Sequence, residues 1–415
     1  MGHLNHHSYG RMAQRLGQYV PGAFVSATLV EILKQLVTEE EAQLCSLMPL
    51  RTVPAEKMAR VWGMDAEEAR AVLDRLAGKG VVYAFAGDSG TAYGLAPPVL
   101  GFVEFSLMRT DGKLDAKRLS ELYYQYCQVE GDFVRQHGAI SSPAFTRVYA
   151  GEDVLEDVAA EVLSYDRVSV GIETATCITV GLCYCRHKME HMGQACNAPQ
   201  EVCLTFNEVA RYLADYGIAK EISKEEARRI VKECMNEGLV QIGDNTRSGL
   251  AVICNCCGCC CDLLLGYRRF GSSGLISPSA FLAAIDQNIC TSCGICAKRC
   301  PAGAIDTAGD KPMVKPKVCL GCGVCARFCP NDSCHMYPRT PRPYIPKDSI
   351  EKILVSAVHA GKLGNYLFDN QTSQLHALLR RAVNAAVIFP PIKSLLLSKL
   401  VQSTMFRFLR AGKRC

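Results

Sequence analysis

The sequence lacks the motifs that would tie its 415 residues to nucleotide or radical chemistry. It has no G-x-G-x-x-G fingerprint of dinucleotide-binding folds, no P-loop and no C-x3-C-x2-C run of radical-SAM enzymes. The N-terminus has no basic patch followed by an apolar stretch, so we expect neither a secretory signal nor a disulfide framework. No apolar stretch is long and uncharged enough to span a bilayer. The sequence therefore predicts a cytoplasmic protein without a transmembrane helix.

Acidic residues are also missing from the end of the chain, where none occurs beyond Asp369. Eight Lys and Arg residues follow it, so this tail carries +8 while the whole chain carries +5 and the preceding part −3. Apolar residues between Leu395 and Leu409 accompany these bases. The pattern fits a peripheral contact with an anionic membrane surface, and equally packing against the protein itself or a partner.

Cysteine, by contrast, is abundant and crowded. There are 24 cysteines, and 19 of them lie in two stretches, Cys183 to Cys261 and Cys290 to Cys329. In a reducing cytosol, clustered thiols indicate metal or cluster ligands, and we expect such a chain in an anaerobic or low-oxygen cell. Four isolated cysteines are interpreted as core residues instead: Cys45, Cys127, Cys177 and Cys234.

The second cysteine stretch contains one motif twice, with the spacing C-x2-C-x2-C-x3-C-P. Three thiolates on a tight loop reach three corners of an iron–sulfur cubane, and the fourth corner must be met from elsewhere. A pair of zinc ribbons is the alternative, but it needs only two ligands per knuckle and no fourth cysteine before proline. The motif predicts two 4Fe-4S clusters on eight residues: Cys290, Cys293, Cys296, Cys300, Cys319, Cys322, Cys325 and Cys329.

The first stretch holds ten further candidate ligands in two groups. One is a tetrad spaced C-x-C-x10-C-x6-C, made of Cys183, Cys185, Cys196 and Cys203. The other places six thiols within eight residues: Cys254, Cys256, Cys257, Cys259, Cys260 and Cys261. Adjacent cysteines cannot pair without strain, so metal or cluster binding is expected. One or two more 4Fe-4S clusters, zinc on the tetrad, or a cluster with an open iron that does substrate chemistry all fit, and the spacing does not say which four thiols act together.

Basic residues adjoin the tetrad, and two roles are open for them. Cations near a cluster favour its reduced form and raise its potential. The alternative is a solvated basic face of a helix. The residues concerned are Arg186, His187, Lys188 and His191.

Residues 23–105 resemble a winged-helix domain. Thr38 and Glu41 match a capping box, and two glycines end the last expected helix before a hairpin. The expected elements are helices over 54–61 and 65–77 and strands over 81–85 and 92–95.

A second copy of this pattern occurs 158 residues later, where Glu225-Glu226-Ala227-Arg228 corresponds to Glu67-Glu68-Ala69-Arg70. Ser223 and Glu226 again predict a capping box. The last strand of the second wing, over 251–253, would lead directly into Cys254. We therefore expect this helix and wing to present thiolates.

The whole chain is expected to be an α+β, multidomain protein. Its predicted segments are an N-terminal extension (1–22), a winged-helix-like domain (23–105), a helical region (106–175), a cysteine-rich cluster module with the second helix and wing (176–262), a connector (263–287), a two-cluster ferredoxin-type domain (288–337), a Pro-rich linker (338–348) and a helical basic tail (349–415).

From about residue 10 to 337 the chain resembles a family of bacterial 4Fe-4S dicluster-domain proteins, through the run from Cys183 to His191, the Cys254 to Cys261 loop and the two ferredoxin runs. In bacterial two-cluster ferredoxins the fourth cysteine of each run ligates the other cluster. The resemblance therefore implies a first cluster on Cys290, Cys293, Cys296 and Cys329, and a second on Cys319, Cys322, Cys325 and Cys300. It implies electron transfer. We therefore expect an electron carrier or oxidoreductase subunit that relays electrons between a low-potential donor and a redox partner protein.

Two other functions stay open. A redox-sensing DNA-binding regulator would use the winged helix, which commonly reads the major groove. However, five bases within residues 54–79 are balanced by five acids, whereas phosphate contact needs a positive surface, so nucleic acid is not the expected partner. The other is an electron-input subunit of a reductase with an open-site cluster in the upstream module.

Overall fold

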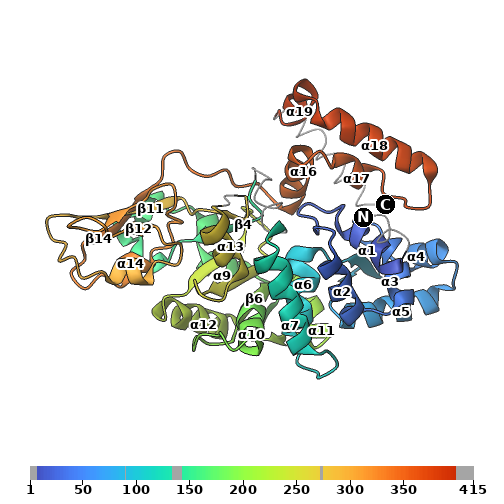
Figure 1. The fold of residues 1–415 in the computed structure, drawn as a ribbon, viewed down its shortest axis with the longest axis horizontal. Helices are drawn as coiled ribbons and strands as arrows, with labels where there is room; N and C mark the ends of the chain where they lie inside the picture. Colours follow the sequence, from blue (N-terminus) through green and yellow to red (C-terminus); the bar gives the residue numbers. More distant parts are fainter. Residues whose placement is uncertain (1–6, 89, 133–142, 272–273, 399–415) are drawn as a thin grey trace. The chain divides into compact units, whose positions relative to one another are not determined.

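The computed structural model describes residues 7–88, 90–132, 143–271 and 274–398, and within these ranges the chain forms two compact units (Figure 1). The first unit consists of the described parts of Met1–Ser106 and Pro346–Cys415, with Pro143. The second consists of the described parts of Leu107–Ala139 and Ala144–Ile345. The two ends of the chain thus share one unit, an arrangement that local sequence patterns do not reveal.

The N-terminal part of the first unit places helices around a three-stranded antiparallel sheet with the order β1-β3-β2. Thr38 caps its helix through the predicted capping box, since the Glu41 amide donates to Thr38 Oγ1 and the Thr38 amide donates to Glu41 Oε2. The predicted helices and hairpin are confirmed close to their expected positions, while the winged-helix name stays a prediction. The elements are α1 Ser8–Leu16, α2 Ala27–Leu36, α3 Glu39–Ser46, β1 Val53–Pro54, α4 Ala55–Trp62, α5 Ala66–Gly78, β2 Val82–Gly87, β3 Gly90–Leu95 and α6 Val103–Met108.

The C-terminal part of the first unit is helical, as predicted. Asp369 ties it to the N-terminal helices, because its carboxylate pairs with the buried Arg15 and accepts a 2.6 Å hydrogen bond from the Leu50 amide. The expected membrane-contact segment falls largely on residues 399–415, outside the described residues. No helix in the described ranges has the length and apolar character needed to cross a membrane. The helices are α16 Ser349–His359, α17 Leu363–Leu367, α18 Gln374–Ile388 and α19 Pro390–Leu396.

A seven-stranded sheet with the order β10-β4-β8-β9-β6-β5-β7 is the framework of the second unit. All neighbouring strands are antiparallel except β10 and β4. The strands are β4 Thr146–Tyr149, β5 Ile178–Leu182, β6 Glu201–Phe206, β7 Lys220–Glu221, β8 Val240–Asp244, β9 Val252–Cys256 and β10 Ile276–Ser277. Strand β4 lies within the segment predicted to be helical, and its four residues are all buried, so no alternation of polar and apolar residues marks it as a strand.

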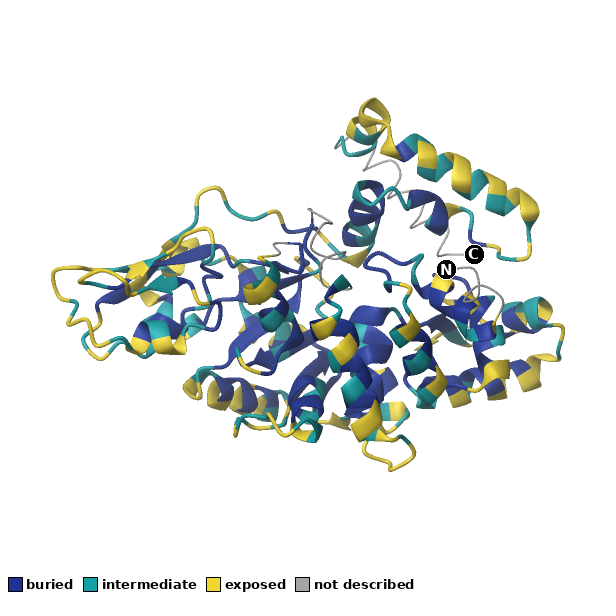
Figure 2. Ribbon diagram, viewed as in Figure 1, coloured by how far each residue is buried: buried dark blue, intermediate teal, exposed yellow. Residues whose placement is uncertain are grey.

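Helices cover this sheet and close its core. α12 buries Ala227, Ile230, Val231 and Cys234 in a cluster with residues of β5 and β6, and leaves its other face exposed (Figure 2). The helices are α7 Ala116–Tyr124 with a π-helical turn at Gln125–Val129, α9 Val168–Thr174, α10 Tyr184–His191, α11 Asn207–Asp215, α12 Lys224–Asn236 and α13 Asp262–Phe270. Short 3-10 turns lie at Glu152–Val154, Glu156–Glu161 and Ser164–Asp166.

The second helix and hairpin form where the sequence predicts them, but in a different setting. Ser223 caps α12 by accepting from the Glu226 amide, whereas the Glu226 carboxylate pairs with Arg229 instead of completing a capping box. β8 and β9 are central strands of the seven-stranded sheet rather than a free wing, because β9 also pairs with β6. β9 continues to Cys256, so two of the candidate cysteines lie in a strand.

The remaining part of the second unit contains the two ferredoxin runs on two small antiparallel sheets, β11 with β14 and β12 with β13. Residues 339–348 that follow have no regular helix or strand, and the Pro-rich linker stays a prediction. The elements are β11 Phe281–Ile285, α14 Ile295–Arg299, β12 Ile305–Asp306, β13 Met313–Val314, α15 Val324–Arg327 and β14 Cys334–Pro338.

Candidate functional site

Each ferredoxin run folds as a tight loop that turns into a short helix, α14 in the first run and α15 in the second. The third cysteine of each run, Cys296 or Cys325, lies in that helix. Gly321 allows the second loop to lie against β11, because its φ is +69° and a Cβ there would collide with the Phe281 carbonyl oxygen. The second loop therefore requires glycine at this position.

The eight cysteines of the two runs line two hollows. Each hollow takes three cysteines from one run and the fourth from the other, which is the grouping that the resemblance implies. The first hollow is lined by Cys290, Cys293, Cys296 and Cys329. The second is lined by Cys300, Cys319, Cys322 and Cys325.

Backbone and side-chain donors reach the two cysteines that cross between the runs. The Ala304 amide donates to Cys300 Sγ at 3.2 Å, and Ser333 Oγ lies 3.1 Å from Cys329 Sγ. Burial raises the pKa of Cys300, although the Ala304 amide works against it. Burial is also the largest single influence at Cys329, but hydrogen bonds from the Ser333 side chain and from the amides of Asn331, Ser333 and Cys334 together outweigh it and lower that pKa. Four soft sulfur donors around a hollow suit an iron–sulfur cluster, whose positive irons would offset the desolvation of the thiolates.

Cys334 also belongs to this region, and sequence reasoning assigned it no role. It is buried at the start of β14, lines the first hollow, and its thiol interacts with Cys325 of the second. That interaction, ahead of burial, raises the pKa of Cys325. The alternation of buried Cys334 and Met336 with exposed His335 and Tyr337 was the available signal, because it is the pattern of a strand with one face in the core.

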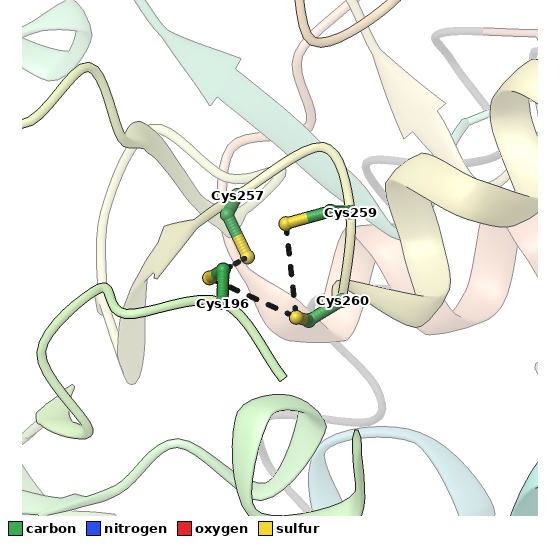
Figure 3. A group of neighbouring side chains, drawn as sticks. All are labelled: Cys196, Cys257, Cys259 and Cys260. Atoms are coloured by element: carbon green, nitrogen blue, oxygen red, sulfur yellow. Dashed lines mark hydrogen bonds between the residues drawn. The ribbon is translucent and has the colours of Figure 1, made fainter. Parts of the chain in front are cut away.

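The upstream cysteines are grouped differently from the sequence tetrad. Cys196, from the segment between α10 and β6, meets Cys257, Cys259 and Cys260 from the loop between β9 and α13, and the four sulfurs point toward one another (Figure 3). Cys196 Sγ lies 3.7 Å from Cys257 Sγ and 3.8 Å from Cys260 Sγ, and Cys259 Sγ lies 3.7 Å from Cys260 Sγ. We call these four residues the thiol quartet.

The other six upstream cysteines form a second group, a continuous string of interacting thiols. Its order is Cys183, Cys185, Cys261, Cys256, Cys254 and Cys203. Burial opposes ionisation of Cys185, but the hydrogen bonds from its two neighbours and the charge of Lys188 lower its pKa well below the usual value. We call these six residues the thiol string.

Two buried cations from α10 adjoin these groups. The interpretation of this helix as a solvated basic face is therefore wrong for these two residues. Arg186 and Lys188 are each 0% exposed. Arg186 Nη1 donates to the Asn255 carbonyl oxygen at 3.1 Å and lies 3.7 Å from Cys257 Sγ. Lys188 pairs with Asp262, the first residue of α13. The hydrogen bond from Cys260, opposed by burial and aided by Arg186, lowers the pKa of Cys257 to about 4.

The thiol quartet adjoins the second ferredoxin hollow. A side chain at Gly258 would bring its Cβ within 3.1 Å of Pro301 Cα, so the quartet loop packs directly on the residue after Cys300. The Gly151 amide donates to the Cys322 carbonyl oxygen at 3.2 Å, and Arg327 Nε donates to Asp153 at 2.7 Å. These contacts fix the second run of cysteines to the sheet framework of the same unit.

The comparisons agree with the geometry in one part of the chain. Residues 282–342 match a family described as the 4Fe-4S dicluster domain, a range that contains both ferredoxin runs. The match supports a ferredoxin-type domain there, 4Fe-4S binding and a role in iron–sulfur electron transfer. No curated protein and no solved structure matches the chain.

Proposed function

We propose that this chain is a one-electron relay that carries two 4Fe-4S clusters in the two ferredoxin hollows. The proposal rests on one observation, which we call the crossing of the runs: the fourth cysteine of each run lines the hollow of the other run. Cys300 of the first run lines the second hollow, and Cys329 of the second run lines the first. A bound 4Fe-4S cluster accepts and donates one electron. The protein supplies the thiolates, the amide of Ala304 and the burial that tune it.

The two hollows differ in their surroundings, and this difference distinguishes their roles in the proposed relay. Cys293 is exposed in the first hollow, and Ile289 and Ile295 beside it are exposed apolar side chains. The second hollow instead packs against the upstream cysteine module through Pro301. A redox partner protein would therefore exchange electrons at the first hollow, while the second communicates with the interior of the unit.

The thiol string is the proposed site of a third iron–sulfur centre. Its six thiols exceed the four that one cubane needs, and cluster binding would draw the hydrogen-bonded thiols of the string apart. The positive charge of Lys188 interacts electrostatically with Cys185, and that of Arg186 with Cys183 and Cys256. These two charges would help to balance a negatively charged cluster. A reducing cytoplasm is the compartment that suits this many thiols.

Nucleic-acid binding is not part of the proposal, because three of the five bases within residues 54–79 already pair with acids. Arg75 and Lys79 both reach the Glu41 carboxylate, and Arg70 lies 3.2 Å from Glu56. Binding to a nucleic-acid backbone needs basic side chains that are free to neutralise the charge of the phosphates.

Paired cysteine variants test the crossing directly. Anaerobically purified protein should contain about eight iron atoms and as much sulfide from the two ferredoxin clusters, and about twelve with the third centre. Cys290→Ser and Cys329→Ser should each remove the same cluster, so that the double variant loses no more iron than either single variant. Cys329→Ser with Cys319→Ser should lose both clusters.

Cys45→Ala, a buried cysteine of the first unit, is the matched control and should keep all of the iron. Additive iron loss in Cys290→Ser with Cys329→Ser would contradict the crossing. Zinc as the only metal in oxygen-free preparations would contradict the relay itself.

A further inference from the structure

The thiol quartet has the dimensions of a site for a single metal ion. In a tetrahedral site with metal–sulfur bonds of about 2.3 Å, neighbouring sulfurs lie about 3.8 Å apart. The three measured sulfur–sulfur distances in the quartet are 3.7, 3.7 and 3.8 Å. Three of the six edges of such a tetrahedron therefore already have the expected length, and all four sulfurs lie within 4.8 Å of one another.

A cubane would require a wider arrangement. Each thiolate of a 4Fe-4S cluster binds a different iron, and the irons are themselves separated, so the four sulfurs must stand further apart than around one ion. The ferredoxin cysteines have this wider arrangement, because each set of four surrounds a hollow. Within the described ranges, the quartet is the only set of three or more His, Cys, Asp or Glu ligand atoms that all lie within 4.8 Å of one another.

The surroundings of the quartet also suit a closed site. Cys257 and Cys260 are buried, Cys196 is half-buried and only Cys259 is exposed, so the site is largely shielded from solvent. Four protein ligands also fill all positions of a tetrahedral ion and leave none for a substrate. Arg186 is fully buried, and its Nε and Nη2 atoms have no hydrogen-bond partner although Nη1 lies 3.7 Å from Cys257 Sγ. A divalent ion with four thiolates carries a charge of about −2, and this guanidinium is placed to offset part of it.

We infer that Cys196, Cys257, Cys259 and Cys260 bind one zinc ion in a structural site, separate from the iron–sulfur centres. Soft thiolates in a tetrahedral set of four are the ligands of structural zinc. The ion joins the segment before β6 to the loop before α13. Because Gly258 of that loop lies against Pro301, zinc also fixes the surface on which the second ferredoxin run packs.

Metal analysis of the anaerobic full-length protein tests the inference separately from the relay. We expect one zinc per chain beside the iron, and a zinc-edge X-ray absorption spectrum of the unaltered protein with four sulfur neighbours at about 2.3 Å. Cys196→Ser should lose the zinc and keep the iron and sulfide of the ferredoxin clusters. Cys203→Ser, a cysteine of the thiol string, is the matched control and should keep the zinc.

The spectrum of the unaltered protein keeps the test valid even if a variant does not fold. Nitrogen or oxygen neighbours at the zinc, or the absence of zinc, would overturn the inference. So would the loss of about four iron atoms and their sulfide from Cys196→Ser, because the quartet would then belong to a cluster.

Discussion

Arg186 lies between the thiol quartet and the thiol string, with no exposed surface. Burial alone would lower its pKa, but Cys183, Cys257 and Cys256 raise it, so the guanidinium stays charged among the thiols. A buried charge persists in a protein only where an opposite charge and hydrogen bonds compensate it. Arg186 is therefore expected to stabilise ionised thiolates, which are the form that binds a metal.

Arg186→Gln tests this role at the residue scale. The amide can still donate to the Asn255 carbonyl oxygen, but the positive charge is lost beside Cys257, so the free energy of unfolding should fall by about 3 kcal/mol. Chemical denaturation of anaerobic protein, followed by circular dichroism, measures the change. Arg229→Gln is the control, since Arg229 pairs with Glu226 and Glu233 on the exposed face of α12 and should contribute less than about 1 kcal/mol. Equal losses in both variants would contradict the assignment.

At the scale of elements, Glu41 links α3 to α5. Its side chain closes the capping box with Thr38 and also pairs with Arg75 and Lys79 at the end of α5. Burial opposes its ionisation, but Lys79, the Thr38 amide and Arg75 together hold the pKa of this carboxyl below its usual value. Its contribution to stability is therefore complete above the unfolded pKa of about 4.3 and is lost as the pH falls through the lower folded pKa.

Glu41→Gln should lower the unfolding free energy of the first unit by about 1–3 kcal/mol at pH 7, because a buried carboxylate loses its charge-assisted hydrogen bonds. The difference from the unaltered protein should shrink as the pH falls below about 4.3. Calorimetry over a series of pH values measures both effects. Glu39→Gln changes an exposed carboxylate in the same turn and should show neither. A difference that does not depend on pH would contradict the assignment.

The elements that could be predicted are those specified by neighbouring residues. Thr38 with Glu41 and Ser223 mark helix starts through local hydrogen bonds, and the ferredoxin runs carry their loop geometry in their own spacing. The thiol quartet could not be predicted this way, because Cys196 and Cys257 meet only through the pairing of β6 with β9. Sequence spacing grouped Cys196 with Cys203 in one tetrad but did not say which four thiols act together. Strand β4 was missed because it is buried along its whole length.

At the scale of the second unit, the cysteine-lined hollows and the sheet framework are one connected structure. The Gly151 amide donates to the Cys322 carbonyl oxygen in the second ferredoxin loop, and Asp153 pairs with Arg327 of α15. Tyr267 of α13 donates to the Val318 carbonyl oxygen at 3.1 Å, immediately before Cys319. A loop that holds a metal centre loses its geometry when the metal leaves, so these contacts should weaken with it.

Removal of iron should therefore raise the rate of hydrogen exchange at Gly151, which lies outside the ferredoxin runs. Hydrogen exchange measured by mass spectrometry, before and after iron chelation under anaerobic conditions, should show faster exchange in peptides over residues 150–155 and 317–329. Peptides over α2 and α3 in the first unit are the internal control and should not change. Unchanged exchange over 150–155, despite complete loss of iron, would mean that the framework holds this segment without help from the second cluster. Faster exchange over both 150–155 and 317–329 is the outcome that the Gly151 to Cys322 contact predicts, since that contact holds the Gly151 amide while the second loop stays in place.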